Sequence, residues 1–305
     1  MPARLLKGSI TMAQFIQQLI NGLSLGSIYA LIALGYTMVY GIINLINFAH
    51  GEIYMVGAYI GFALTTFLNL GFIPSLLISM VGCSILGMIV EKVAYKPIRN
   101  STRISALITA ISVSLFLQYT MMYFVSPQTR TFPEVLKRKS INLLDGKIIL
   151  DQKSIYIVTI TVLLMLLLQY IVQKTKLGKA MRAVAQDKEA AELMGVDVNK
   201  IISYTFAIGS ALAGAAGVLV GVYYNTINPL MGVTPGLKAF VAAVLGGIGI
   251  IPGAVFGGFF LGMTETIVSA YGGSIFKDAV AFGILILVLL IKPNGLLGKT
   301  IKEKV

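Results

Sequence analysis

Long apolar runs limit this sequence to folds that lie within a lipid bilayer. A helix needs about 20 residues, with a range of about 17–25, to cross the hydrocarbon core, and the runs cover residues 12–36, 42–70, 73–90, 104–125, 155–172, 201–224 and 275–291. A further run, residues 237–271, would form a helix of about 50 Å against a core of about 30 Å. Pro252 and several glycines interrupt it, so we divide it into a short segment and a returning span. The sequence predicts an all-α, polytopic membrane helix bundle of about eight or nine spans, with broken or re-entrant helices, as a single domain over residues 1–305.

The composition supports a membrane protein and argues against a nucleic-acid-binding one. Hydrophobic residues make up 57% of the chain and charged residues only 12%, whereas soluble domains carry about 25% charged residues. The net charge is +12, but the basic residues lie between the apolar runs rather than on one face or in one tail. This distribution indicates membrane topology. The first run lacks a clear cleavage site, and we expect it to remain as the first span.

Lysine and arginine residues predict which loops share a side of the membrane. Residues 91–103, 174–200 and 292–304 all carry clusters of basic residues, and the span order places them on one side. Cytoplasmic loops are enriched in lysine and arginine, so we expect this side to be cytoplasmic. The loop 126–154 is then extracytoplasmic, although it is also basic. With nine spans, the N-terminus lies outside.

The longest polar stretch between apolar segments, residues 174–200, has the pattern of a short amphipathic helix or a helix pair. Apolar side chains recur three to four residues apart, which favours one apolar face, and Gly195 follows where a helix should end. An apolar face on the water side of a membrane protein needs a partner. An alternative is a helix that lies on anionic lipid. The residues of the expected apolar face are Leu177, Met181, Val184, Ala185, Leu193 and Met194.

A second polar cluster interrupts the apolar run 42–70. Ionisable groups at membrane depth are costly and normally face a bundle interior or a wet cavity, so we expect the helix to break here. The side chains could line a solute path, cap the broken helix, or relay protons together with Glu265, which is the other carboxylate well inside a span. The region 244–253 is a second predicted interruption. The cluster comprises Asn44, Asn47, His50, Gly51 and Glu52.

Several glycines are spaced four residues apart, which lets helix backbones approach closely in lipid. We expect these pairs to be packing faces rather than binding sites. They are Gly22 and Gly26, Gly57 and Gly61, Gly217 and Gly221, Gly253 and Gly257, and Gly258 and Gly262.

The sequence gives no enzymatic interpretation. Residues 247–252 imitate a dinucleotide-binding fingerprint, but Pro252 replaces its third glycine. Residues 298–300 imitate the end of a phosphate loop, but Pro293 stands where that motif needs a glycine. We also find no cysteine and histidine pattern for a metal and no nucleophile with a base partner. We expect no catalytic residue, no bound metal and no cofactor in this chain.

Three stretches resemble one known family. Residues 177–183 read LGKAMRA, residues 22–31 read GLSLGSIYAL and residues 41–52 read GIINLINFAHGE. Together with the ending KPNGLLG at residues 292–298, they resemble the LivH-type permease subunits of ABC transporters that import branched-chain amino acids. The resemblance implies that residues 174–200 form a cytoplasmic coupling loop that docks on an ATPase. Its coupling residues would be Gly178, Arg182, Asp187, Glu189, Ala190, Ala191 and Gly195.

The same resemblance implies the partners and the location. They are a second related permease subunit, two cytoplasmic ATPase subunits that bind the ATP, and an extracytoplasmic solute-binding protein, assembled in the bacterial inner membrane. The solutes would be leucine, isoleucine and valine. Two alternatives remain open: an importer of the same family for urea, a short amide or another amino acid, and a proton-coupled secondary transporter.

Overall fold

A computed structural model describes residues 12–43, 45, 47–99, 101–136, 140–143 and 148–298 of the chain. The protein is mostly helical, as predicted. Its helices are α1 (Met12–Ile43), α2 (His50–Phe67), α3 (Phe72–Val90), α4 (Lys96–Ile98), α5 (Arg103–Phe124), α6 (Gln152–Lys174), α7 (Lys176–Gln186), α8 (Lys188–Leu193), α9 (Val198–Tyr224), α10 (Val233–Gly246), α11 (Ile251–Ile267) and α12 (Phe276–Ile291), with π-helical turns η1 (Glu91–Tyr95) and η2 (Val268–Gly272).

Two small antiparallel sheets depart from the all-α prediction. Strands β1 (Arg130–Thr131) and β4 (Thr226–Ile227) pair across the end of α9, and β2 (Ser140–Leu143) pairs with β3 (Ile148–Asp151). Three of the four strands lie in the predicted loop 126–154. They have only two to four residues each, so their alternation of apolar and polar residues is too short to predict a strand. The helical bundle itself is unaffected.

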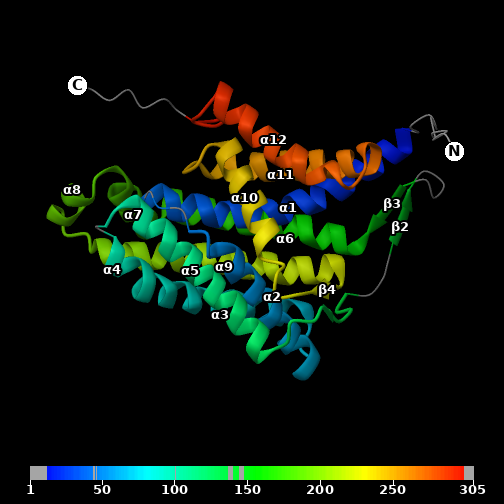
Figure 1. Ribbon diagram of the computed structural model, residues 1–305, viewed down its shortest axis with the longest axis horizontal. Coiled ribbons are helices and arrows are strands. Elements are labelled where there is room, and N and C mark those ends of the chain that lie inside the picture. Colours follow the sequence, from blue (N-terminus) through cyan, green and yellow to red (C-terminus); the bar gives the residue numbers. More distant parts are fainter. Residues whose placement is uncertain are drawn as a thin grey trace.

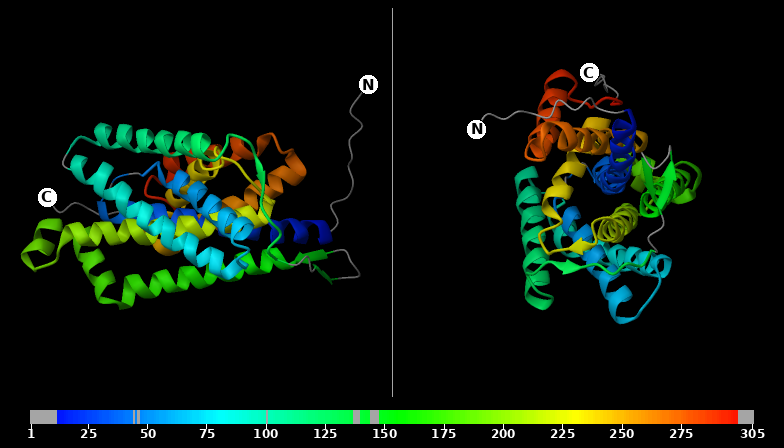
Figure 2. Two further views of the ribbon diagram at one scale, coloured as in Figure 1. Left: turned by 90° about the horizontal axis from the view of Figure 1, so that it is seen from below. Right: turned by 90° about the vertical axis from the view of Figure 1, so that its right-hand side faces the viewer.

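Helices α1 and α9 form the centre of the bundle, and the other helices pack around them (Figures 1 and 2). In the most apolar window of each helix, 89% of the residues of α1 and α9 are buried, against 22% for α5 and α6. Helix α11 lies along α1, while α2 and α3 lie along α9. The exposed apolar faces of α5 and α6 are what lipid or a neighbouring subunit would cover.

Glycines bring α1 and α11 into backbone contact. A Cβ atom added at Gly262 would lie 2.3 Å from the Cα of Gly26, and one at Gly22 would lie 2.7 Å from the Cα of Met263. On the other side of the core, a Cβ at Gly57 would lie 2.6 Å from the Cα of Gly214 on α9. These contacts confirm the predicted packing role of the glycine pairs, because no larger side chain fits there.

The predicted interruptions are present at both places. Helix α1 ends at Ile43 and α2 begins at His50, so Asn47 lies in the break and His50, Gly51 and Glu52 lie in the first turn of α2. The run 237–271 is divided into α10 and α11 by a turn in which Gly247 and Gly249 have φ values of +103° and +91°. Helix α10 has 14 residues, or about 21 Å, and is too short to cross a core of about 30 Å by itself.

The predicted count of eight or nine spans is not confirmed. Within the described residues, six helices are long and apolar enough to cross a membrane: Met12–Ile43, Phe72–Ile98, Ile104–Phe124, Gln152–Lys174, Val198–Tyr224 and Ile251–Gly272. Helix α2 carries His50 and Glu52 in its first turn, and α10 and α12 have 14 and 16 residues. Helices α2, α10 and α12 were predicted as spans and are not among these six, which accounts for the difference from nine.

The predicted loop 126–154, which contains β2 and β3, and the polar stretch 174–200, which contains α7 and α8, lie at opposite ends of the bundle (Figures 1 and 2). Helix α6 connects β3 directly to α7, and its 23 residues extend over about 35 Å. The start of α1 lies at the β3 end, where the Gln17 side chain exchanges hydrogen bonds of 3.1 and 2.8 Å with the backbone of Ile149. Helices α4 and α8 lie at the other end. Which end faces the cytoplasm stays a prediction.

Candidate functional site

The polar stretch 174–200 folds as a helix pair, α7 and α8, at one end of the bundle (Figure 1). Thr175 caps α7 by accepting a hydrogen bond from the Gly178 amide at 3.1 Å. Asp187 caps α8 in the same way, with the Ala190 amide at 3.0 Å. Side-chain oxygens of these residue types satisfy the free amides of a first helical turn. The sequence therefore places both helix starts.

Gly178 and Arg182 fix α7 against the last turn of α6. A Cβ atom at Gly178 would lie 2.2 Å from the Val172 carbonyl oxygen, so only glycine permits the close approach. The Arg182 guanidinium donates a hydrogen bond to the same oxygen. Met181 and Val184 are 2% and 1% exposed against the bundle. Gly178 and Arg182, two of the predicted coupling residues, thus form the elbow between α6 and α7.

The predicted apolar face packs against the bundle at three of its four positions in α7, and it does not continue as one face into α8. Leu177 is half-buried and Met181 and Val184 are buried, but Ala185 is exposed. Leu193 and Met194, at the end of α8, are 88% and 84% exposed. The turn between α7 and α8 changes the direction of the chain, so one helical period cannot run through both.

Helix α8 presents most of the remaining predicted coupling residues to solvent. Asp187, Glu189 and Ala190 are exposed, and Ala191 is buried. Gly195 ends the helix with φ at +82°, and nothing lies within 4 Å of a Cβ built there. Its constraint is therefore conformational, since side chains other than glycine rarely adopt this φ.

Asp197, the next capping residue, starts α9. Its carboxylate accepts a hydrogen bond from the Lys200 amide at 3.1 Å and pairs with the Lys200 ammonium. The Lys200 amide and the Lys200 side chain lower the pKa of Asp197. Residues 194–197 therefore connect the exposed tip of α8 directly to the start of the central helix α9.

Most of the second predicted cluster is packed into the core rather than around a cavity. Asn44 lies outside the described residues. Asn47 accepts a hydrogen bond from the Tyr95 hydroxyl at 2.8 Å. His50 is 1% exposed, and its ring lies edge-on to Tyr36 with centroids 4.8 Å apart. Neither ring nitrogen has a hydrogen-bond partner among the described residues.

Gly51 packs α2 against the start of α10. A Cβ atom there would lie 2.5 Å from the Gly232 carbonyl oxygen. This contact and the burial of His50 fit the interpretation that part of the cluster braces the broken helix.

Glu52 differs from its neighbours because it lines a cavity. The cavity holds about 340 Å³ and lies between α1, α2, α5 and α10. Glu52 is 1% exposed, its Oε1 atom is 3.4 Å from the Ser114 hydroxyl, and its Oε2 atom has no hydrogen-bond partner among the described residues. The other lining residues are Tyr36, Phe48, Leu107, Ile111, Ser114, Leu115, Gln118, Gly232, Val233, Gly236 and Leu237.

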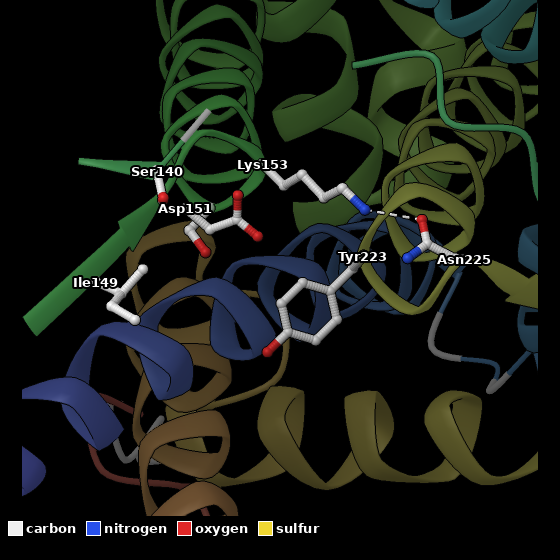
Figure 3. A pocket seen from close by; sticks show the side chains of 7 residues that line it. Ser140, Ile149, Asp151, Lys153, Tyr223 and Asn225 are labelled. Carbon is white, nitrogen blue, oxygen red and sulfur yellow. Dashed lines mark hydrogen bonds between the residues drawn. The ribbon is translucent and has the colours of Figure 1, made fainter. Parts of the chain in front are cut away.

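Sequence reasoning missed a second cavity, at the β2–β3 end (Figure 3). It holds about 380 Å³ and is lined by polar groups from β2, β3, α6 and the end of α9. The Lys153 ammonium donates a hydrogen bond to the Asn225 side-chain oxygen at 2.8 Å, and Asp151 also lines the cavity, beside Ser140. Asn225 adopts φ of +55°, which a helix-terminating asparagine tolerates. The sequence signal was Lys153 at the first turn of an apolar span.

Sequence reasoning also missed a buried charge network between α1, α10, α11 and α12. The Lys238 ammonium lies 2.7 Å from a Glu265 carboxylate oxygen and 2.6 Å from an Asp278 oxygen. The Tyr29 hydroxyl donates to Glu265 at 2.8 Å. Glu265 was the candidate partner of His50 in a proton relay. In the structure it forms an ion pair with Lys238 instead. Lys238 stands in an apolar run, and that position was the available signal.

No metal-binding geometry occurs in the part of the chain that the structure describes, where no three His, Cys, Asp or Glu side chains come together. Cys83 is buried and free. What remains at the sites is a solvent-exposed helix tip, a polar cavity and an apolar cavity with one carboxylate. That set suits docking and solute binding.

The fold as a whole is similar to that of a chain in a solved structure. The PsaBC structure from Streptococcus pneumoniae, in complex with Fab, aligns with a TM-score of 0.51 at 14% sequence identity and covers 93% of this chain and 94% of that one. This likeness shows the fold alone. The six apolar helices of spanning length among the described residues indicate a polytopic, helical membrane protein.

The sequence comparisons then give the family. Residues 18–289 match the family described as the permease component of the branched-chain amino acid transport system, and the chain belongs to that family. It is 45% identical over 302 residues to the high-affinity branched-chain amino acid transport system permease protein BraD of Pseudomonas aeruginosa. It is 44% identical over 307 residues to LivH of Escherichia coli K12, and each alignment covers 95% of this chain and 98% of the relative. A probable LivH of Methanocaldococcus jannaschii is 30% identical over 89% of both chains.

Proposed function

We propose that this chain is the permease subunit of an ATP-driven importer that carries leucine, isoleucine and valine across the inner membrane. The single observation that carries the proposal is the match to BraD and LivH over 95% of the chain at 44–45% identity. Such identity over almost the whole length covers both the helical core and the polar ends. The chain itself performs no chemistry on the solute or on ATP.

The proposed complex contains a second related permease subunit, two ATPase subunits and an extracytoplasmic binding protein. The exposed faces of α5 and α6 leave apolar surface for lipid and for the second permease subunit. The α7–α8 element supports the ATPase assignment, since it ends in the exposed apolar side chains Leu193 and Met194. Exposed apolar groups at a polar end of a membrane protein favour a protein partner.

The elbow gives a physical route for coupling. Helix α7 is fixed to α6 by Gly178 and Arg182, and it also packs against the central helices α1 and α9. A displacement of α8 by the closing ATPase subunits would therefore be passed to three spans at once. Rigid-body motion of packed helices is a common form of switching between inward-open and outward-open states. The predicted coupling residues act on this route in two groups, the elbow and the exposed tip.

In the proposed path, Glu52 lines the solute cavity, whereas Asn47, His50 and Gly51 hold α2 in place. This division follows the contacts of each side chain: only Glu52 among the described members of the cluster lines the 340 Å³ cavity. Asn44, the remaining predicted path residue, lies outside the described residues.

Solute competition tests the function. The full complex is reconstituted in proteoliposomes with ATP enclosed and binding protein outside, and uptake of labelled leucine is challenged with unlabelled solutes. We expect isoleucine and valine to compete and urea, acetamide and lysine not to compete. Competition by urea or acetamide at equal concentration would show instead that the chain belongs to an importer of another solute. Co-purification of the complex from native membranes identifies the partner chains.

A further inference from the structure

The cavity at Glu52 combines one buried carboxylate with apolar walls. Its aliphatic and aromatic lining comes from α5, α10 and the break before α2, and includes Leu107, Ile111, Leu115 and Phe48. At about 340 Å³ it falls at the small end of the range of about 300–1,000 Å³ for ligand pockets. A short aliphatic ligand suits this size and lining.

The Glu52 carboxylate lacks a counter-charge. In the part of the chain that the structure describes, no lysine or arginine forms an ion pair with it. Each of the other deeply buried carboxylates has one: Glu91 pairs with Arg99, and Glu265 pairs with Lys238. Burying a charge without a partner is costly, so Glu52 stands apart from the two carboxylates that serve packing.

The unpaired oxygen of Glu52 lies against the start of α10. A Cβ atom built at Gly232, the residue before α10, would lie 2.6 Å from Oε2. The absence of a side chain at Gly232 keeps space at this oxygen, and the positive end of the α10 dipole acts on it. The Ser114 hydroxyl, near Oε1, adds a second polar group on the α5 side.

The cavity borders the outer surface of the bundle along α5. Leu107, Ile111 and Leu115 are 42%, 46% and 45% exposed, while the Glu52 side of the cavity is buried. Within the cavity, the apolar side chains of α5 therefore lie on the outer side and the carboxylate lies at the inner end. This arrangement suits a molecule with a charged group at one end and a hydrocarbon body behind it.

We infer that this cavity is a cargo-binding site in which Glu52 accepts the primary ammonium group of a compound with a short branched aliphatic body. The ammonium supplies the missing counter-charge, and the hydrocarbon contacts the walls from α5 and α10. The inference rests on the proposed function, because the cargo of the importer is the compound that would reach the site. No covalent step is involved, and Glu52 is a binding residue.

Three small probes separate the ammonium group from the rest of the cargo. Leucine carries an ammonium and a carboxylate, 3-methylbutylamine carries only the ammonium, and 4-methylpentanoate carries only the carboxylate. Saturation-transfer difference NMR on the purified complex, without the binding protein, detects weak binding of each. We expect leucine and 3-methylbutylamine to bind, and 4-methylpentanoate to bind roughly tenfold more weakly or worse. Equal binding of the amine and the acid, or no signal from any probe, would overturn the inference.

Variants then locate the binding. Glu52→Gln removes the charge and keeps the shape, and we expect it to weaken amine binding roughly tenfold while it leaves the complex assembled. Ser114→Ala should weaken the amine less, and Ser112→Ala is the matched control. Ser112 is exposed on the same helix, and its hydroxyl donates a hydrogen bond to the Ile108 carbonyl oxygen one turn earlier. Unchanged amine binding in Glu52→Gln would contradict the inference.

Uptake measured in parallel distinguishes the two proposals. If the wild-type complex fails to take up leucine while the amine still binds at Glu52, the importer proposal fails and the site stands. If leucine uptake proceeds and Glu52→Gln changes neither its KM nor the NMR selectivity, the importer stands and the site fails.

Discussion

The Arg182 guanidinium on α7 donates a hydrogen bond to the Val172 carbonyl oxygen in the last turn of α6. Gly178 lies against the same oxygen, so a hydrogen bond and a close backbone approach act at one point. The last turn of a helix leaves carbonyl groups without partners inside the helix, and here a neighbouring helix supplies the donor. The elbow joins a polar helix pair to the membrane bundle as one piece.

Replacing Gly178 with alanine tests the elbow. The new Cβ would lie 2.2 Å from the Val172 oxygen, so α7 must shift, and we expect the free energy of unfolding to fall by about 1–3 kcal/mol. ATP-driven leucine uptake should fall further than the loss of folded protein explains. The matched control is Gly283→Ala, since nothing lies within 4 Å of a Cβ there. Thermal unfolding and uptake rate, measured on both, check this, and equal behaviour of the two variants would refute the elbow.

Replacing Leu193 with aspartate tests docking at the tip. Leu193 is 88% exposed in the isolated chain, so the change leaves the fold of the permease intact, while it places a charge where an ATPase subunit would contact an apolar group. We expect the amount of ATPase that co-purifies with a tagged permease to fall roughly tenfold. Ile141→Asp is the control, because Ile141 is 54% exposed in β2 at the opposite end. A larger effect of Ile141→Asp would place the ATPase at the β2–β3 end and contradict docking at α8.

Thiol labelling tests the sidedness of the two ends. Single cysteines at Lys188 on α8 and Ile149 on β3 are treated with a membrane-impermeant maleimide on intact cells. The native Cys83 is 0% exposed and stays silent. We expect labelling at position 149 in intact cells and at position 188 only after permeabilisation. The reverse pattern would invert the topology and remove the coupling role of α8.

Replacing Lys238 with methionine tests the buried charge network. The change leaves Glu265, which is 5% exposed, without its lysine, and removal of one partner of a buried ion pair typically costs about 3–5 kcal/mol. The double variant Lys238→Met with Glu265→Gln removes both charges, so we expect it to recover part of the loss. Thermal unfolding of the two single variants and the double variant forms a cycle that measures the coupling. Additive losses would show that the two side chains act independently.

Much of the fold could be predicted because it depends on local patterns. The apolar runs predicted most of the helices, and the polar cluster predicted the break between Ile43 and His50. Gly195 and the apolar residues spaced three to four apart in residues 174–200 predicted the helix pair. Each of these depends on residues close together in the sequence.

The rest depends on contacts between distant residues. The pairing of Lys238 with Glu265 and Asp278, and the contact of Glu52 with the start of α10, join elements that periodicity does not relate. Leu193 and Met194 were placed on an apolar face because one helical period was extended across a turn. The β2–β3 pair had a sequence signal, Asp145-Gly146 between two short apolar runs, which is typical of a hairpin.

The initial rate of labelled leucine uptake into proteoliposomes tests the central claim most directly. Vesicles containing the complete complex, with binding protein outside, enclose either ATP or a non-hydrolysable analogue. The account predicts concentrative uptake with ATP, none with the analogue, and none from vesicles that hold this chain and its related permease subunit alone. Equal uptake with the analogue, or full uptake by the permease subunits without ATPase, would contradict it.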